Sequence, residues 1–181
     1  MPSVSNRPRT QFATLSRILH WLMAAMLLSM LFIGAAMVSS LSAYHRLLAI
    51  HRPLGIAILV LAVARALNRQ LTELPPFPVS MSSLERRIAS VSEKLLYTLM
   101  FALPLVGWSM LSAGGYPVVM CGAFHLPPIL APSPLLYAAL REAHTVLAYT
   151  LFVTFLGHLS AILFHTFIVR DGILRRMLWR R

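Results

Sequence analysis

The apolar run HTVLAYTLFVTFLGHLSAILFH occupies residues 144–165, and its strongly polar side chains are all histidines: His144, His158 and His165. An α-helix turns about 100° per residue, so side chains seven or fourteen positions apart fall on nearly the same face. The three imidazoles therefore lie along one stripe, with His144 and His158 about 21 Å apart along the helix axis. Polar groups at two depths of a membrane-compatible helix predict two sets of partners inside the protein.

The composition of the whole chain is typical of a membrane protein. Of its 181 residues, 58% are hydrophobic and 12% are charged, against roughly 45–50% and 25% in soluble domains. The length gives room for a single domain, residues 1–181. A net charge of +11 would suit nucleic acid only on a soluble basic surface, and no stretch remains to build one, so no nucleic-acid partner is expected. The single cysteine, Cys121, excludes an intrachain disulfide.

Four apolar runs predict an all-α transmembrane four-helix bundle. The first run is more than 20 residues long, against about 7–15 for the apolar part of a signal peptide, so we expect a retained helix. The link at 112–142 is apolar but rich in proline, which favours a lid on the membrane surface over a fifth span. The expected helices cover roughly residues 18–41, 47–67, 91–111 and 143–169.

The basic residues predict the orientation of the bundle. Thirteen of the 16 Lys and Arg residues fall in the N-terminal segment, around the second link or in the tail, and the other three are Arg46, Arg52 and Arg141. Basic residues accumulate on the cytoplasmic side of membrane proteins, so both termini are predicted to be cytoplasmic. The same residues suit contact with anionic membrane lipid.

With this orientation the histidines fall into two levels. His51 and His144 form an outer pair, and His20 forms an inner pair with either His158 or His165. Two neutral imidazoles from facing helices suit the iron of a haem, whose macrocycle is apolar. Zinc would favour four ligands at one depth, and a proton relay would usually include carboxylates within the membrane. A single buried histidine could equally bond a neighbouring carbonyl group.

Several stretches together resemble the bacterial cytochrome b561 family of four-helix inner-membrane proteins with two b-type haems. The resemblance implies that His51 and His144 hold one haem, and that His20 and His158 hold the other. His165 then becomes a candidate for a quinone site, although Thr166 stands where many family members have a second histidine. The matching stretches are RILHWLMA (17–24), HRPLGIAILVLAVARALNR (51–69), LLYTLMFALPLVGW (95–108), CGAFHLPPILAPSP (121–134), REAHTVLAY (141–149), GHLSAILFH (157–165) and RDGILRRML (170–178).

Three arginines are candidates for contact with the anionic propionates of haem. Arg52 and Arg141 neighbour the outer histidines, and Arg17 precedes His20. Arginine forms strong charge-assisted hydrogen bonds with carboxylates. The alternative for each is a long side chain that reaches from the bundle to the membrane surface.

These observations predict an oxidoreductase-type electron carrier that crosses the bacterial inner membrane several times. The resemblance implies a sharper version, in which superoxide at the periplasmic face supplies electrons that pass inward to ubiquinone. A periplasmic redox protein is the alternative donor. A haem-free transporter or assembly factor, whose histidines bind a metal or carry protons, is the alternative from a different functional class.

Overall fold

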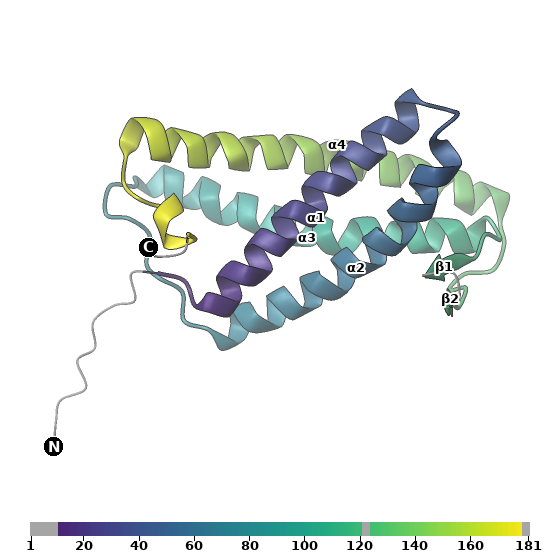
Figure 1. The fold of residues 1–181 in the computed structure, drawn as a ribbon, viewed down its shortest axis with the longest axis horizontal. Coiled ribbons are helices and arrows are strands. Elements are labelled where there is room, and N and C mark those ends of the chain that lie inside the picture. The colour runs from purple at the N-terminus through teal and green to yellow at the C-terminus, as the bar shows by residue number, and fades with distance from the viewer. Residues whose placement is uncertain (1–10, 121–123, 179–181) are drawn as a thin grey trace, which may run out of the picture.

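A computed structural model describes residues 11–120 and 124–178 of the chain, and it is dominated by four long helices (Figure 1). All four are long and apolar enough to cross a membrane, which confirms the predicted fold class. The elements are α1 (Thr14–Ser39), α2 (Tyr44–Leu71), α3 (Ser83–Ala113), β1 (Val118–Met120), β2 (Phe124–Leu126), α4 (Pro134–Phe164), the π-helix η1 (His165–Val169) and the 3₁₀-helix η2 (Leu174–Arg176). Arg7, Arg9, Cys121, Arg180 and Arg181 lie outside the described residues.

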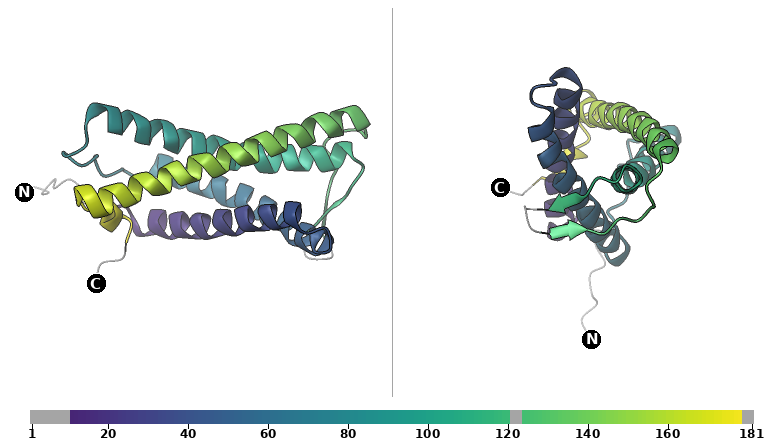
Figure 2. Two further views of the ribbon diagram at one scale, coloured as in Figure 1. Left: turned by 90° about the horizontal axis from the view of Figure 1, so that it is seen from above. Right: turned by 90° about the vertical axis from the view of Figure 1, so that its right-hand side faces the viewer.

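The bundle is built from two helix pairs. Helix α1 packs on α2, α3 packs on α4, and α2 joins the pairs by packing on α3 (Figure 2). Large apolar side chains such as Phe32, Val153 and Phe167 are more than 60% exposed on the outer faces. An exposed apolar surface of this extent is expected for helices that face lipid.

Both ends of the described chain lie at one end of the bundle, and the β1–β2 hairpin lies at the other (Figure 1). The backbone N–H of Phe12 donates to the carbonyl of Arg176 at 3.2 Å, and Trp21 Nε1 donates to the carbonyl of Met177 at 2.9 Å. The two ends therefore share a side of the bundle, as the predicted orientation requires. That this side is cytoplasmic stays a prediction from the distribution of basic residues.

All four helices begin earlier than the hydropathy pattern predicts, α1 and α2 by three or four residues and α3 and α4 by more. Helix α3 starts eight residues before position 91, because Ser82 and Glu85 form a capping box that satisfies its first backbone N–H groups. Helix α4 starts nine residues before position 143, where the Ser133 side chain accepts a hydrogen bond from the Leu136 N–H and Pro134 occupies the first turn. Residues 134–142 of the predicted lid are therefore helical.

The remaining part of that link is packed onto the end of α3. Strands β1 and β2 pair antiparallel, with Val118 opposite Leu126. Trp108 Nε1 donates to the carbonyl of Pro127 at 3.1 Å, and the buried Ser112 hydroxyl accepts from the Ile129 N–H at 3.2 Å. These bonds fix the link against the end of the bundle where His51 and His144 lie.

A small apolar cluster fills the middle of the bundle. Leu151 is seven residues from both His144 and His158 along α4, and Ile58 is seven residues after His51 on α2. Each of these two side chains is only 3% exposed. The cluster therefore forms a layer between the two levels of histidines, and below we call it the middle layer. Its buried members are Met23, Leu27, Ile58, Ala62, Leu99, Met100 and Leu151.

Candidate functional site

The outer level brings together the two histidines that the sequence pairs there. His51 projects from α2 and His144 from α4, and their ring centroids are 6.2 Å apart with an angle of 66° between the ring planes. The Nδ1 atom of each ring is buried and has no hydrogen-bond partner. The two rings meet edge to face. Leaving buried polar atoms unpaired costs free energy, so this pair of rings is a candidate site for a further group.

The separation of these rings fits shared ligation of one metal ion. An imidazole nitrogen binds a metal at about 2 Å, so two rings on opposite sides of one ion have centres roughly 6 Å apart. Neutral imidazoles are also good ligands for transition metals such as iron. Among the described residues no three His, Cys, Asp or Glu side chains gather into a larger metal cluster. The donor set at this level is therefore a pair.

Helix α3 packs against His144 of the outer site at Gly107. A Cβ atom at Gly107 would lie 3.3 Å from Cε1 of His144, which is tighter than ordinary packing, and 3.5 Å from its Nδ1, which is an ordinary contact. The backbone carbonyl of Leu103 also lies beside this ring, without the geometry of a hydrogen bond to Nδ1. A carbonyl in this position is a common outer partner of metal-bound histidine. The sequence did not reveal this role for Gly107, because it depends on which helix faces the glycine.

The inner level involves all four helices. His20 on α1 and His158 on α4 are close enough to interact electrostatically, and both also interact with Arg65 on α2. Arg65 in turn donates from Nε to the hydroxyl of Tyr97 on α3 at 3.1 Å. His20 and His158 are therefore neighbours at the inner level, and their pairing as ligands stays a prediction. Sequence reasoning used Arg65 only as a charge that sets orientation.

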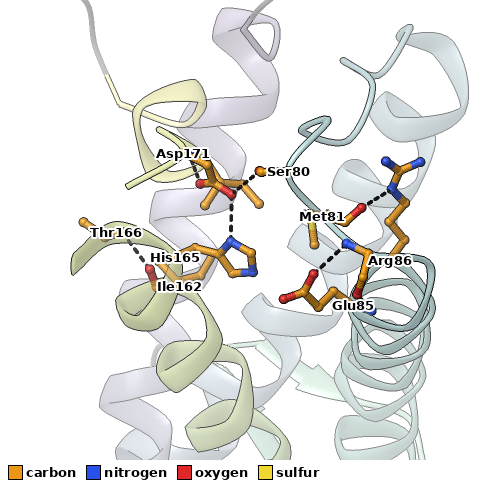
Figure 3. Close-up of polar contacts among 10 residues, drawn as sticks. Ser80, Met81, Glu85, Arg86, Ile162, His165, Thr166 and Asp171 are labelled. Atoms are coloured by element: carbon orange, nitrogen blue, oxygen red, sulfur yellow. Dashed lines mark hydrogen bonds and ion pairs between the residues drawn. The ribbon is translucent and has the colours of Figure 1, made fainter. Parts of the chain in front are cut away.

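His165 lies in a separate polar cluster nearer the end of the bundle that holds the termini. Its side chain is 8% exposed, and its Nδ1 atom lies 2.7 Å from Oδ2 of Asp171, whose side chain is 5% exposed. The Ser80 hydroxyl donates to the same carboxylate oxygen at 3.2 Å (Figure 3). The Ile173 N–H donates to the other carboxylate oxygen at 3.1 Å. His165 also begins the π-helical turn η1, a feature often found at functional sites.

The carboxylate of Asp171 is held in its ionised form. Burial by itself would raise its pKa, but the hydrogen bonds from His165, the Ile173 backbone and Ser80 outweigh burial, and the pKa is lowered below its usual value. The cluster therefore pairs a buried anion with an imidazole. The sequence did not indicate a role for Asp171, because only the folded tail returns it to His165.

The three predicted arginines have different surroundings. Arg17 is buried, and it donates to the carbonyl of Leu178 at 2.9 Å and to the Thr14 hydroxyl at 3.1 Å, so it fixes the tail. Arg52 donates to the carbonyl of Pro117 at 3.4 Å and has a buried Nε atom without a partner. Arg141 is exposed near the start of α4. Arg52 is therefore the one that combines a place beside the outer pair with spare donor capacity.

Comparison with known proteins matches this chain to one family of membrane cytochromes. A sequence model described as prokaryotic cytochrome b561 matches residues 11–180. Cytochrome b561 homolog 2 of Escherichia coli (strain K12) is 32% identical over 97% of this chain and 95% of its own length. Cytochrome b561 homolog 1 of the same strain is 28% identical over 72% of this chain and 74% of its own length. A Yersinia pestis protein named probable superoxide oxidase CybB is 30% identical over 71% of this chain and 73% of its own length.

Proposed function

This chain belongs to the prokaryotic cytochrome b561 family, and from that membership we propose that it carries electrons across the bacterial inner membrane between two haem sites. The family implies a membrane cytochrome that binds b-type haem. The presence of two haems, their ligands and the electron partners are parts of the proposal. The observation that carries it is the presence of two histidine pairs on different helices, at two depths of one bundle.

In this proposal His51 and His144 hold the outer haem, and His20 and His158 hold the inner one. A haem iron with two imidazole ligands takes up and releases single electrons at a potential set by ligation, burial and nearby charge. The 6.2 Å separation of the outer rings supports shared ligation. Helix α4 supplies one ligand at each level, fourteen residues apart, which fixes the two sites at about 21 Å along its axis.

The outer end suits a small anionic electron donor. Arg52 and Arg141 lie at this end with Arg46, and such a group of positive charges accelerates the arrival of anions. The relative named probable superoxide oxidase supports superoxide as the donor. Two superoxide anions would then become two molecules of dioxygen, while one ubiquinone takes up two electrons and two protons to form ubiquinol.

Arg52 and Arg141 are also our proposed partners for the outer haem propionates.

The inner end suits a quinone. Such a head group needs hydrogen-bond donors and a source of protons, and the cluster of His165, Asp171 and Ser80 offers both beside η1. Because Nδ1 of His165 is hydrogen-bonded to Asp171, Nε2 is the ring nitrogen that would bind the quinone. Thr166 follows directly, and its hydroxyl donates to the Ile162 carbonyl within the helix. For Arg17, the role of partner to the inner haem stays a prediction.

Replacing single ligands tests the proposal most directly. Protein purified from haem-replete cells should show two haems per chain and a split b-type absorption band on reduction. His51→Ala or His144→Ala should each halve the haem content, whereas His45→Ala, at the start of α2, should leave two haems. A colourless wild-type preparation would overturn the proposal and would favour the haem-free transporter.

The identity of the donor is tested separately. Superoxide added to the oxidised protein should reduce it faster than the same addition made with superoxide dismutase and catalase. Equal rates would remove superoxide as donor and leave the periplasmic redox protein as the alternative, without affecting the haem assignment.

A further inference from the structure

Arg65 is a half-buried residue whose positive charge is not neutralised by any acidic side chain in the described part of the chain. It lies on α2 fourteen residues after His51, and therefore on nearly the same face of that helix, at the inner level. Its Nε atom donates to the Tyr97 hydroxyl at 3.1 Å, and its guanidinium carbon lies 5.6 Å from the centre of the Tyr97 ring. Its Nη1 atom is buried and has no hydrogen-bond partner.

No acidic side chain pairs with Arg65. Every Asp and Glu of this chain lies in its described part, where the ion pairs are Arg69–Glu93 and His165–Asp171. A buried donor atom of a charged group is costly to leave without a hydrogen-bond partner. The unused guanidinium nitrogen is therefore a binding feature for an anion that the chain does not supply.

The surroundings of Arg65 indicate which anion this is. Its charge interacts with both His20 on α1 and His158 on α4. We infer that Arg65 is a positioning residue of the inner site, which binds a carboxylate group of the inner haem and raises the reduction potential of that haem. This inference rests on the proposed two-haem function. A guanidinium binds carboxylates through paired hydrogen bonds, and a nearby positive charge favours the reduced form, which carries one positive charge less.

The chain contains a matched control one helical turn away. Arg69 lies on the same helix, but it is paired with Glu93 at 3.1 Å and its side chain is 37% exposed. Arg65→Gln and Arg69→Gln therefore remove the same charge from neighbouring turns of α2. Because the charge on Arg69 is exposed and already paired, its removal should have little effect inside the bundle.

Redox titration of the full-length protein in neutral detergent tests the inference. The inner transition is identified as the one that survives in His51→Ala. In Arg65→Gln we expect the reduction potential of the inner haem to fall. At a fixed ambient potential its reduced-to-oxidised ratio should drop about tenfold, which corresponds to a potential lower by 59 mV for a one-electron couple. The outer transition should not move, and Arg69→Gln should resemble the wild type. Equal shifts in the two variants would overturn the role of Arg65.

A second variant covers the case in which Arg65→Gln is not recovered as folded protein. Arg65→Lys keeps the charge but loses the paired geometry of the guanidinium. It should leave the inner potential near that of the wild type, while haem passes several-fold faster to excess apomyoglobin. Transfer at the wild-type rate would contradict the binding role.

The anion could also come from a lipid phosphate, and the composition of the bilayer separates the two sources. If a lipid supplied it, the shift in Arg65→Gln would appear in nanodiscs with anionic lipid and vanish in neutral detergent, which would overturn the inference. A wild-type protein with fewer than two haems would instead contradict the proposed function itself.

Discussion

At the scale of single residues, Gly107 shows how closely the outer site is packed. A methyl group there would press on the His144 ring at 3.3 Å. Gly107→Ala should displace this ring by a few tenths of an ångström and lower the content of outer haem, so that the haem-to-protein ratio falls below two. Spectra and haem assays of the purified variant provide the measurement.

Gly34→Ala is the matched control for this substitution. A Cβ atom at Gly34 meets nothing within 4 Å, and alanine in a helix is about 1 kcal/mol more favourable than glycine. This variant should keep two haems per chain. If both alanine variants had the same haem content, it would be wrong that Gly107 leaves the room that the His144 ring needs to bind haem.

The residues that could be predicted from the sequence are those with a periodic signal. His144 and His158 fall on one face of an apolar helix, and His20 and His51 lie near the starts of two other apolar runs. Pairing at two levels was therefore predictable from spacing and orientation, whereas the choice of His158 over His165 came from the family resemblance. Arg65 and Gly107 carry no such signal. Their roles depend on which side chain of another helix they face, and that is fixed only when the bundle packs.

At the scale of elements, the tail is fixed to the bundle by a carboxylate whose effect depends on pH. Asp171 joins the segment after η1 to His165 and to Ser80 in the link between α2 and α3. Its pKa is lowered in the folded protein, so the stabilisation is present above the unfolded pKa of about 3.9 and is lost as pH falls through the lower folded value.

Asp171→Asn should remove this pH dependence. We expect the variant to be less stable than the wild type at pH 7, by about 1.5–3 kcal/mol for hydrogen bonds to a charged group, with the difference shrinking toward pH 3. Thermal unfolding of the detergent-solubilised protein between pH 3 and 7 gives the comparison. Glu142→Gln, at an exposed site on α4, should follow the wild type, and a constant difference for Asp171→Asn across this range would refute the assignment.

Helix positions were predictable from hydropathy, but two helix starts were not. The pattern of apolar residues marks the part of a helix that faces lipid, and α3 and α4 both extend beyond it into polar sequence. Their starts are set by the local caps at Ser82 and Ser133. The Ser82–Glu85 capping box is visible in the sequence, but the basic residues that follow it are equally typical of a link.

At the scale of the whole molecule, the middle layer determines what can cross the membrane through this protein. The buried members of the cluster are all apolar, and Leu151 and Ile58 lie between the two histidine levels. Protons need a chain of polar groups or water, whereas an electron does not. On the proposed function, charge therefore crosses the layer without a compensating proton.

This separation makes the turnover sensitive to transmembrane voltage. An electron that moves inward over about 21 Å of a roughly 30 Å core works against an inside-negative potential, at a cost of about 1.6 kcal/mol per 100 mV. In proteoliposomes with quinone, an imposed potassium diffusion potential of this sign should disfavour inward transfer on the order of tenfold, and an uncoupling ionophore should abolish the effect. A voltage-independent rate would mean that protons follow the same route. If the layer insulates as its side chains indicate, the energised state of the cell itself limits how fast this cytochrome delivers electrons to the cytoplasmic side.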